Sequence, residues 1–226
     1  MSMSEDVQRA DAPVRDSWQI ARALRSGVIV DDRVFDAVFP LSARVRSTLY
    51  WTPVEVAVRA ASLLANRAGA TILDIGSGVG KFCIVASAAA NANVRGIEHR
   101  PHLIEIAREA ARRIGVTATF DSGAIGEQDA AEIDGFYLYN PFAENLCSTT
   151  EALDTTVELS VKRFRRDVAA TVRLLSTARI GARVVTYCGF GGELPDGFVL
   201  VLRERCAGNH LELWVKNAES EPAPEL

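Results

Sequence analysis

The stretch TILDIGSGVGKFC, residues 71–83, is an apolar run that breaks into three glycines at alternate positions and then turns polar. The apolar part is typical of a buried strand, and the polar part begins a helix. Gly76, Gly78 and Gly80 let the backbone turn tightly and approach a ligand without a Cβ in the way. The helix that follows presents free backbone N–H groups toward that ligand. The stretch therefore predicts a ligand-binding loop between the first strand and the next helix of an α/β domain.

Two common phosphate-binding loops do not fit this spacing. A P-loop needs a glycine five positions before the glycine of its Gly-Lys pair, where this chain has Ile75. It also needs Ser or Thr for magnesium where this chain has Phe82. A dinucleotide loop, GxGxxG, would place its third glycine at the position of Lys81. The spacing here is GxGxG, with Asp74 two residues before the first glycine.

The remaining chain alternates short apolar runs with amphipathic helical segments, which is typical of a parallel sheet in a right-handed α/β fold. After the fifth strand, two strand-like runs separated by a Gly-Asn turn predict an antiparallel hairpin. The predicted strands are residues 71–75, 94–97, 116–120, 136–139, 183–187, 198–205 and 211–216. The predicted helices are residues 17–25, 34–39, 81–90, 102–114 and 156–175, and one that Thr52 caps, with Pro53 first, running toward Gly69.

Acidic residues lie near the ends of the first strand and the second. Asp74 suits an ammonium group, while the N–H groups beside the glycine loop suit a carboxylate, so this half of the site matches an amino-acid zwitterion. Glu98 ends the second strand, 24 positions after Asp74, where it can accept both hydroxyls of an unmodified ribose. A ligand with an amino acid at one end and a ribose at the other is S-adenosylmethionine, the predicted cofactor.

The strings LDIGSGVG and GIE resemble motifs of the class I S-adenosylmethionine-dependent methyltransferases, over about residues 50–216. The resemblance implies a Rossmann-like α/β sheet of five parallel strands and a C-terminal antiparallel hairpin, in the order 3-2-1-4-5-7-6. It also implies that Asp121 binds the adenine amino group, although an ordinary turn aspartate is the alternative. The further cofactor-binding residues that it implies are Gly76, Ser77, Gly78 and Gly80 for the methionine end, Glu98 for the ribose and His99 beside the adenine.

The fourth strand is followed by Asn140, Pro141 and Phe142, where this family places the sulfonium. An Asn carbonyl and a backbone carbonyl fixed by proline can hold an amine so that its lone pair points at the methyl group. The adjacent Phe can stack on a planar acceptor or shield the sulfonium from water. The alternative is a plain turn. The motif is similar to the Asn-Pro-Pro-aromatic motif of methyltransferases that act on amino groups of adenine, guanine or glutamine, but it lacks the second proline.

Two further resemblances favour nitrogen as the acceptor. The segment 50–53, Tyr-Trp-Thr-Pro, resembles a segment of adenine amino-methylases and implies that Thr52 lies at the methionine end, with a capped helix as the alternative. The string DIGSGVGKF is similar to that of the non-SET histone-lysine methyltransferases. A lysine acceptor would have to lose a proton first, for which Glu144 is a candidate contributor. A base amine needs only stacking and hydrogen bonds.

Composition limits the partners and the location. The chain has 226 residues and a formal charge of −4, and it lacks the basic character of a protein that grips duplex DNA. No apolar run approaches the roughly 18 residues that span a bilayer, so we expect a cytoplasmic protein without membrane association.

The cysteines Cys83, Cys147, Cys188 and Cys206 show no metal-site spacing; we expect reduced core thiols and no bound metal. The basic residues Lys162, Arg163, Arg165, Arg166 and Arg173 are typical of a solvated helix face, with an RNA- or phosphate-facing role as the alternative.

The sequence therefore predicts an enzyme that transfers a methyl group from S-adenosylmethionine to a nitrogen of a protein side chain, a nucleic-acid base or a small molecule. Asn140, Pro141 and Phe142 are its predicted catalytic residues. The alternative is a catalytically inactive sensor or regulatory subunit that binds the same cofactor. We expect residues 1–50 to form a helical extension that caps the site, residues 51–217 the methyltransferase domain, and residues 218–226 a disordered tail.

Overall fold

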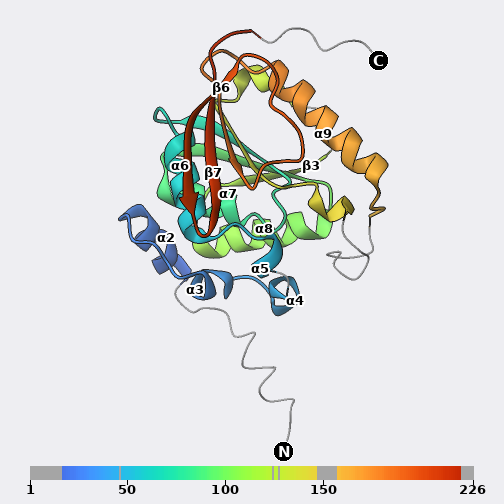
Figure 1. Ribbon diagram of the computed structural model, residues 1–226. Coiled ribbons are helices and arrows are strands. Elements are labelled where there is room, and N and C mark those ends of the chain that lie inside the picture. Colours follow the sequence, from blue (N-terminus) through green and yellow to red (C-terminus); the bar gives the residue numbers. More distant parts are fainter. Residues whose placement is uncertain (1–16, 46, 124, 127, 147–156, 220–226) are drawn as a thin grey trace, which may run out of the picture.

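The computed structural model describes residues 17–45, 47–123, 125–126, 128–146 and 157–219. They contain a seven-stranded sheet in the order β3-β2-β1-β4-β5-β7-β6, which confirms the predicted order (Figure 1). The strands are β1 (Ala70–Ile75), β2 (Ala92–Glu98), β3 (Thr119–Ser122), β4 (Gly135–Tyr139), β5 (Arg183–Tyr187), β6 (Phe198–Cys206) and β7 (Asn209–Lys216). The α-helices are α2 (Ser17–Arg25), α3 (Asp32–Asp36), α4 (Leu41–Arg44), α5 (Ser47–Tyr50), α6 (Val54–Leu64), α7 (Lys81–Ala89), α8 (Pro101–Ile114) and α9 (Val161–Ser176), and the 3₁₀ turns are η1 (Ala130–Glu132) and η2 (Ala143–Leu146).

The sheet has the predicted mixture of strand directions. Strands β1 to β5 run parallel, β7 is antiparallel to β5, and β6 is antiparallel to β7. The chain fills the sheet from β1 outward in one direction and then returns to add β4 on the other side. In open α/β sheets, ligands bind at such a reversal, beyond the carboxyl ends of the strands. The topology therefore places the expected site between the ends of β1 and β4.

Two hydrophobic clusters fix the layers. Side chains alternate across β4, so that Tyr137 enters one cluster while Phe136 and Leu138 enter the other. The first cluster contains the apolar faces of α6, α7 and α8, and α2 packs against α7 and α8. The second cluster includes α9, which lies apart from α6 and α8 in Figure 1. The cofactor loop after β1 is thus held between a thick helical layer and a thinner one.

The N-terminal helices are joined to the main core. Phe35 of α3 and the nearby Phe39 are almost fully buried, and both belong to the same cluster as α6 and α7. The ring of Phe39 lies 4.7 Å from that of Trp51, in an edge-to-face contact. A single apolar core therefore extends from the N-terminal helices to the sheet. The division into an extension of residues 1–50 and a domain of residues 51–217 stays a prediction.

Several element boundaries differ from the prediction, and three of them have a clear physical reason. Helix α8 ends at Gly115, which has a left-handed conformation, and Val116 N–H donates to the carbonyl of Ala111, so that β3 begins at residue 119 and not 116. Helix α3 begins earlier than predicted because Asp31 caps it. Helix α6 begins at Val54, and Thr52 does not cap it. The Val54 N–H instead donates to Asp32 Oδ1 at 2.9 Å, a cap supplied by the N-terminal extension.

Other sequence expectations have mixed outcomes. The prediction of core thiols is right for Cys83 and wrong for Cys188, which is exposed, and Cys206, which is half-buried. Cys147 and residues 220–226 of the predicted tail lie outside the described residues. Within the described chain, none of the helices combines the length and the hydrophobicity that a membrane-spanning helix needs.

Candidate cofactor and methyl-acceptor site

A cavity of about 840 Å³ opens at the carboxyl ends of β1, β2 and β4. Ligand cavities in proteins commonly measure about 300–1,000 Å³, so this one can hold a cofactor together with part of a second molecule. Most of the predicted site residues line it: Thr52, Asp74, Gly76, Ser77, Gly78, Glu98, His99, Asn140, Pro141 and Phe142. Gly80 and Asp121 are not among the lining residues.

The three glycines of the loop have different physical roles. All have positive φ, which favours glycine. A Cβ on Gly76 would lie 2.7 Å from Cβ of Pro141, and a Cβ on Gly80 would lie 2.5 Å from the ring of Phe120. A Cβ on Gly78 would have no other atom of the described chain within 4 Å. Gly76 therefore lets the turn after β4 approach the loop, Gly80 lets the loop pack on β3, and Gly78 leaves open space for a ligand.

Glu98 is fixed at the entrance to this loop. Its Oε1 accepts hydrogen bonds from the backbone N–H groups of His99 at 2.9 Å and Arg100 at 3.0 Å. Its Oε2 accepts from Gly78 N–H at 3.0 Å. Only 5% of the residue is exposed. Because a carboxylate oxygen has two lone pairs, Oε2 retains capacity for a ribose hydroxyl.

Asp74 provides a buried acid beneath the loop. It is 3% exposed, and its Oδ2 accepts a hydrogen bond from Cys83 Sγ at 3.3 Å. Burial raises the pKa of Asp74 to about 7, opposed by the Cys83 hydrogen bond and assisted by the charge of Glu98. An ammonium group at this position would relieve the cost of the buried charge. Burial also raises the pKa of the Cys83 thiol well above its usual range, which makes it a packing residue and not a nucleophile.

The cavity also contains polar atoms that need a partner. Ser77 Oγ and Asn145 Oδ1 are buried without a hydrogen-bond partner among the described residues, and both residues line the cavity. Buried polar atoms without partners are costly, and a polar ligand can satisfy them. Together with the open space at Gly78 and the two carboxylates, these atoms fit the hydroxyl and amino groups of S-adenosylmethionine.

Thr52 reaches the cavity from the helical side. Its hydroxyl lies 3.1 Å from the hydroxyl of Tyr137, and both side chains are buried. The Tyr137 ring stacks on Phe82 with a centroid separation of 3.8 Å. Tyr137 therefore connects Thr52 to the helix that follows the glycine loop. Sequence analysis missed this residue because its place in a central strand indicates only core packing.

Lys81, which excluded the dinucleotide loop, is a buried cation. It is 4% exposed, and its Nζ lies 2.6 Å from Asp32 Oδ1 and 2.6 Å from Asp36 Oδ1. The same ammonium lies over the rings of Phe35 and Trp51, 5.7 and 5.8 Å from their centroids. Since Lys81 follows the last loop glycine, this cluster attaches the N-terminal helices directly to the cofactor loop.

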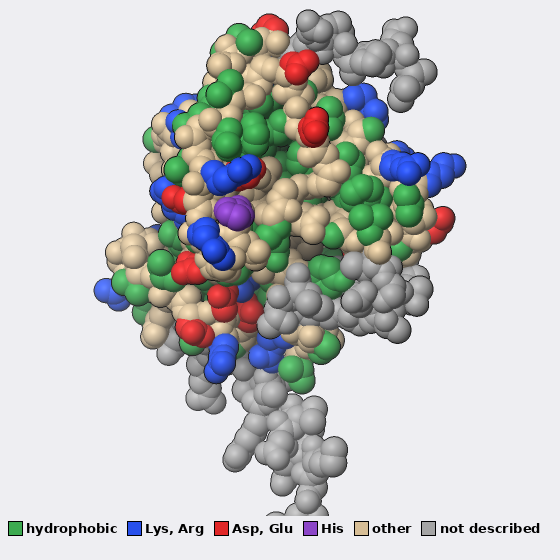
Figure 2. Space-filling model, in the orientation of Figure 1, with side chains coloured by type: hydrophobic (Ala, Val, Ile, Leu, Met, Phe, Trp, Pro, Cys, Tyr) green, Lys and Arg blue, Asp and Glu red, His purple; other side chains and the backbone are tan. Residues whose placement is uncertain are grey.

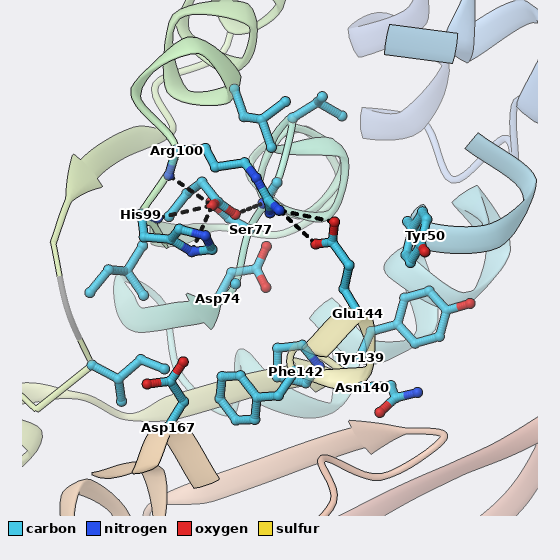
Figure 3. Close-up of a pocket in the computed structure, with 18 of the residues that line it drawn as sticks. Tyr50, Asp74, Ser77, His99, Arg100, Tyr139, Asn140, Phe142, Glu144 and Asp167 are labelled. Atoms are coloured by element: carbon cyan, nitrogen blue, oxygen red, sulfur yellow. Dashed lines mark hydrogen bonds and ion pairs between the residues drawn. The ribbon is translucent and has the colours of Figure 1, made fainter. Parts of the chain in front are cut away.

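The acceptor end of the cavity is formed by the turn after β4. Asn140 has a φ of 39°, and its backbone N–H donates to the carbonyl of Gly189 at 2.9 Å. Within the described residues, the Asn140 side-chain amide has no hydrogen-bond partner. Phe142 is buried beneath it, and Tyr139 stands on the other side of Asn140 in Figure 3. Burial raises the pKa of Tyr139, so that its hydroxyl stays protonated at neutral pH.

Glu144 has a partner that the sequence did not indicate. Arg100 Nη2 lies 2.9 Å from each of its carboxylate oxygens, and both residues are buried (Figure 3). The pair joins the end of β2 to η2, directly after the Asn140-Pro141-Phe142 turn. Because a buried ion pair is costly to break from one side, Glu144 is a structural anion and is poorly placed to serve as a base.

Comparisons with known proteins agree with this geometry. Residues 66–151 match a family described as a methyltransferase domain. The chain is similar to an RNA methyltransferase from Salinibacter ruber solved in complex with S-adenosyl-L-homocysteine, with 26% identity, a TM-score of 0.51, and coverage of 77% of this chain and 96% of that one. A comparison with curated proteins found no significant match.

Two further solved structures share the fold. TrmN from Thermus thermophilus has 19% identity and a TM-score of 0.57, covering 77% of this chain and 53% of that one. A precorrin-6y C5,15-methyltransferase from Geobacter metallireducens has 14% identity and a TM-score of 0.50, covering 84% of this chain and 97% of that one. The matched region contains the glycine loop, Glu98 and the turn after β4, so residues 66–151 carry a methyltransferase domain on a sheet of the order β3-β2-β1-β4-β5-β7-β6, with S-adenosylmethionine as its cofactor.

Proposed function

We propose that this methyltransferase acts on a nitrogen atom that is already uncharged at neutral pH, in a planar group such as a base amine or a side-chain amide. The observation that carries the proposal is the turn Asn140-Pro141-Phe142, which is seated against the cofactor loop through the contact between Pro141 and Gly76. Its open amide and buried ring lie at one end of the cavity. That arrangement suits an acceptor that needs hydrogen bonds and stacking.

The chain's own residues orient the two reactants. S-adenosylmethionine supplies an electrophilic methyl group on its sulfonium. The side-chain carbonyl of Asn140 and the backbone carbonyl before Pro141 can accept the N–H groups of the acceptor, which directs its lone pair toward the methyl group. Phe142 excludes water beside them. Positioning of this kind can contribute several kcal/mol to a displacement reaction.

The fixed position of Glu144 argues against a lysine acceptor. A lysine ammonium, with a pKa near 10.4 in water, must lose a proton before it attacks. Among the described residues, the candidate base for this step was Glu144, and its carboxylate is held by Arg100 at 2.9 Å. A base amine or an amide has no such requirement. The proposal therefore favours planar nitrogens over lysine.

RNA is the first acceptor class to test. The Salinibacter ruber protein, at 26% identity, is an RNA methyltransferase. Three arginines of α9, Arg163, Arg166 and Arg173, line the cavity and could contact phosphates near its rim. On the face drawn in Figure 2, basic and acidic side chains are interspersed, without one large basic surface. A short single-stranded segment fits this surface better than a long duplex.

The test is transfer of labelled methyl groups from S-adenosylmethionine into lysate RNA, protein and small molecules separated after the reaction. We expect label in the fraction that contains the planar nitrogen, and a loss of about 100-fold in rate for Asn140→Ala, with cofactor affinity unchanged. Asn93→Ala, far from the cavity on β2, is the matched control. Cofactor binding without transfer into any fraction would instead support the inactive sensor, and label on lysine would contradict the proposed acceptor.

A further inference from the structure

The family resemblance implied that Asp121 binds the adenine amino group, but Asp121 does not line the cavity. Asp121 lies on β3 at the edge of the sheet, and 53% of its side chain is exposed. Its Oδ2 accepts a hydrogen bond from Arg95 Nη2 at 2.9 Å, and the residue does not line the cavity. Its neighbours Ser122, Gly123 and Ile125 do line the cavity. Among the described residues after β3, none therefore brings the expected carboxylate to this wall of the site.

A different carboxylate enters the cavity from the opposite layer. Asp167 lies on α9, lines the cavity and has only 17% of its side chain exposed. In Figure 3 it rises from α9 into the space beside Phe142, on the far side of the cavity from Arg100. The helix that carries it packs against η2, next to the same turn that carries Phe142. Asp167 thus faces the cavity from the layer of α9, beside Phe142.

Two arginines fix the direction of this carboxylate. Arg166 Nε donates to Oδ1 at 3.0 Å, and Arg163 Nε donates to Oδ2 at 3.4 Å. Arg163 is four residues before Asp167, and Ser160, one turn further back, caps the helix by accepting from Arg163 N–H. Each carboxylate oxygen keeps a second lone pair for a ligand. The side chain is therefore held in place without being saturated.

The residues around Asp167 form a site for a flat, uncharged ring. His99 directly follows β2, and it lines the same cavity as Asp167 and Arg163. Burial is the largest effect and lowers the pKa of His99, so that its imidazole is neutral at pH 7. Ile97, Ile125 and Phe142 supply apolar surface to the same cavity. A purine between these side chains would present its edge to α9.

We infer that Asp167 is the residue that recognises the adenine amino group of the cofactor, in place of Asp121. A carboxylate accepts hydrogen bonds and cannot donate them, so it favours the 6-amino group of adenine over the 6-oxo group of hypoxanthine. A site built to bind an amino group discriminates strongly against an analogue that lacks it, because its polar group is left unpaired. This inference concerns the cofactor alone and does not depend on the identity of the methyl acceptor.

The test compares the affinities of S-adenosylhomocysteine and S-inosylhomocysteine by isothermal titration. We expect the unmodified protein to prefer the adenine compound by at least about tenfold. Asp167→Asn should reduce this preference to about threefold or less, because an amide can donate to the 6-oxo group as well as accept. A general weakening of the site would lower both affinities by the same factor and leave their ratio unchanged, so the ratio reports the recognition of the 6-position alone. Thermal unfolding checks that the variant is folded.

Asp121→Asn is the matched control and should leave the preference unchanged. The inference is overturned if Asp167→Asn keeps the full preference, or if Asp121→Asn is the variant that loses it. Asp167→Ala distinguishes recognition of the adenine from support of α9. It should lower the affinity for S-adenosylhomocysteine and leave the affinity for S-inosylhomocysteine nearly unchanged. Equal weakening of both compounds would show that Asp167 only supports the helix.

Discussion

Asp74 shows how one buried carboxylate can connect stability to cofactor binding. In the ligand-free protein its pKa is about 7, so that near neutral pH a large fraction of the side chain holds a proton. The cofactor's ammonium favours the ionised form and should displace that proton. We therefore expect affinity for S-adenosylmethionine to rise as the pH increases from 6 to 8. Titrations in buffers of different ionisation enthalpy should detect the release of a proton at pH 6.5, and no release would contradict this role.

The same residue predicts an unusual pH dependence of stability. Between pH 3.8, the ordinary pKa of aspartate, and pH 7, the folded state keeps a proton that the unfolded state loses. The unfolding free energy should therefore decrease as the pH rises through this range. Asp74→Asn removes the buried charge and should stabilise the ligand-free protein at pH 8, by at most about 4 kcal/mol, while weakening cofactor binding. Urea unfolding at pH 5 and pH 8 measures this, and a destabilised variant at pH 8 would refute the argument.

Glu98 differs from Asp74 because its carboxylate already accepts hydrogen bonds from the backbone. Glu98→Ala leaves the N–H groups of Gly78, His99 and Arg100 without an acceptor and removes the site for the ribose hydroxyls. We expect roughly a 100-fold loss of affinity for S-adenosylhomocysteine by titration. Glu109→Ala, which removes a surface ion pair on α8, is the control. Unchanged affinity in Glu98→Ala would exclude the residue from the site.

At the scale of elements, the cluster around Lys81 joins α3, α6 and α7. Asp32 Oδ1 accepts from Lys81 Nζ at 2.6 Å and also caps α6 through Val54 N–H. Lys81→Met leaves Asp36 buried without its cation, and burial already raises the pKa of Asp36. We expect a loss of about 3 kcal/mol in unfolding free energy. Asp36→Asn in the same chain should recover part of this loss.

A surface ion pair provides the comparison for this prediction. Arg59 and Glu204 are separated by 2.6 Å, but their side chains are 43% and 30% exposed. Arg59→Met should therefore cost less than about 1 kcal/mol. Both variants are compared by urea unfolding at the same pH. If Lys81→Met costs no more than Arg59→Met, the buried cluster does not attach the N-terminal helices.

These elements also show what sequence reasoning can and cannot reach. The period of apolar residues predicted α2 and β5 with their observed ends, and the glycine spacing predicted the loop between β1 and α7. The cap of α6 was assigned wrongly to Thr52, because Asp32 is 22 positions away and only the folded chain brings it there. Arg100 and Glu144 are 44 positions apart for the same reason. Contacts that close over a long loop leave no local pattern in the sequence.

In the site too, residues that are close in sequence could be predicted to lie together, while contacts between distant residues could not. Glu98 and the glycines belong to one strand–loop–helix unit and its neighbour, so spacing alone was enough to place them together. Asp121 was placed by analogy at the end of β3, yet Arg95 on the adjacent strand holds its carboxylate. The sequence analysis did not single out Asp167, which lies among the basic residues of α9. Only the folded chain brings α9, and Asp167 with it, to the wall of the cavity.

At the scale of the molecule, the sheet order determines where the reactants meet. Its reversal between β1 and β4 places the glycine loop against the acceptor turn, and Gly76 is the contact through which the two approach. The thick helical layer holds the cofactor loop, while α9 closes the opposite side. The cofactor should therefore bind in the one cavity that the described residues form between these layers.

A crystal structure of the protein with S-adenosylhomocysteine tests that account most directly. We predict that the amino-acid end lies over Gly78 near Asp74, and that the ribose hydroxyls lie within hydrogen-bond distance of Glu98 Oε2. A ligand bound outside the cavity, or a ribose with no contact to Glu98, would contradict it.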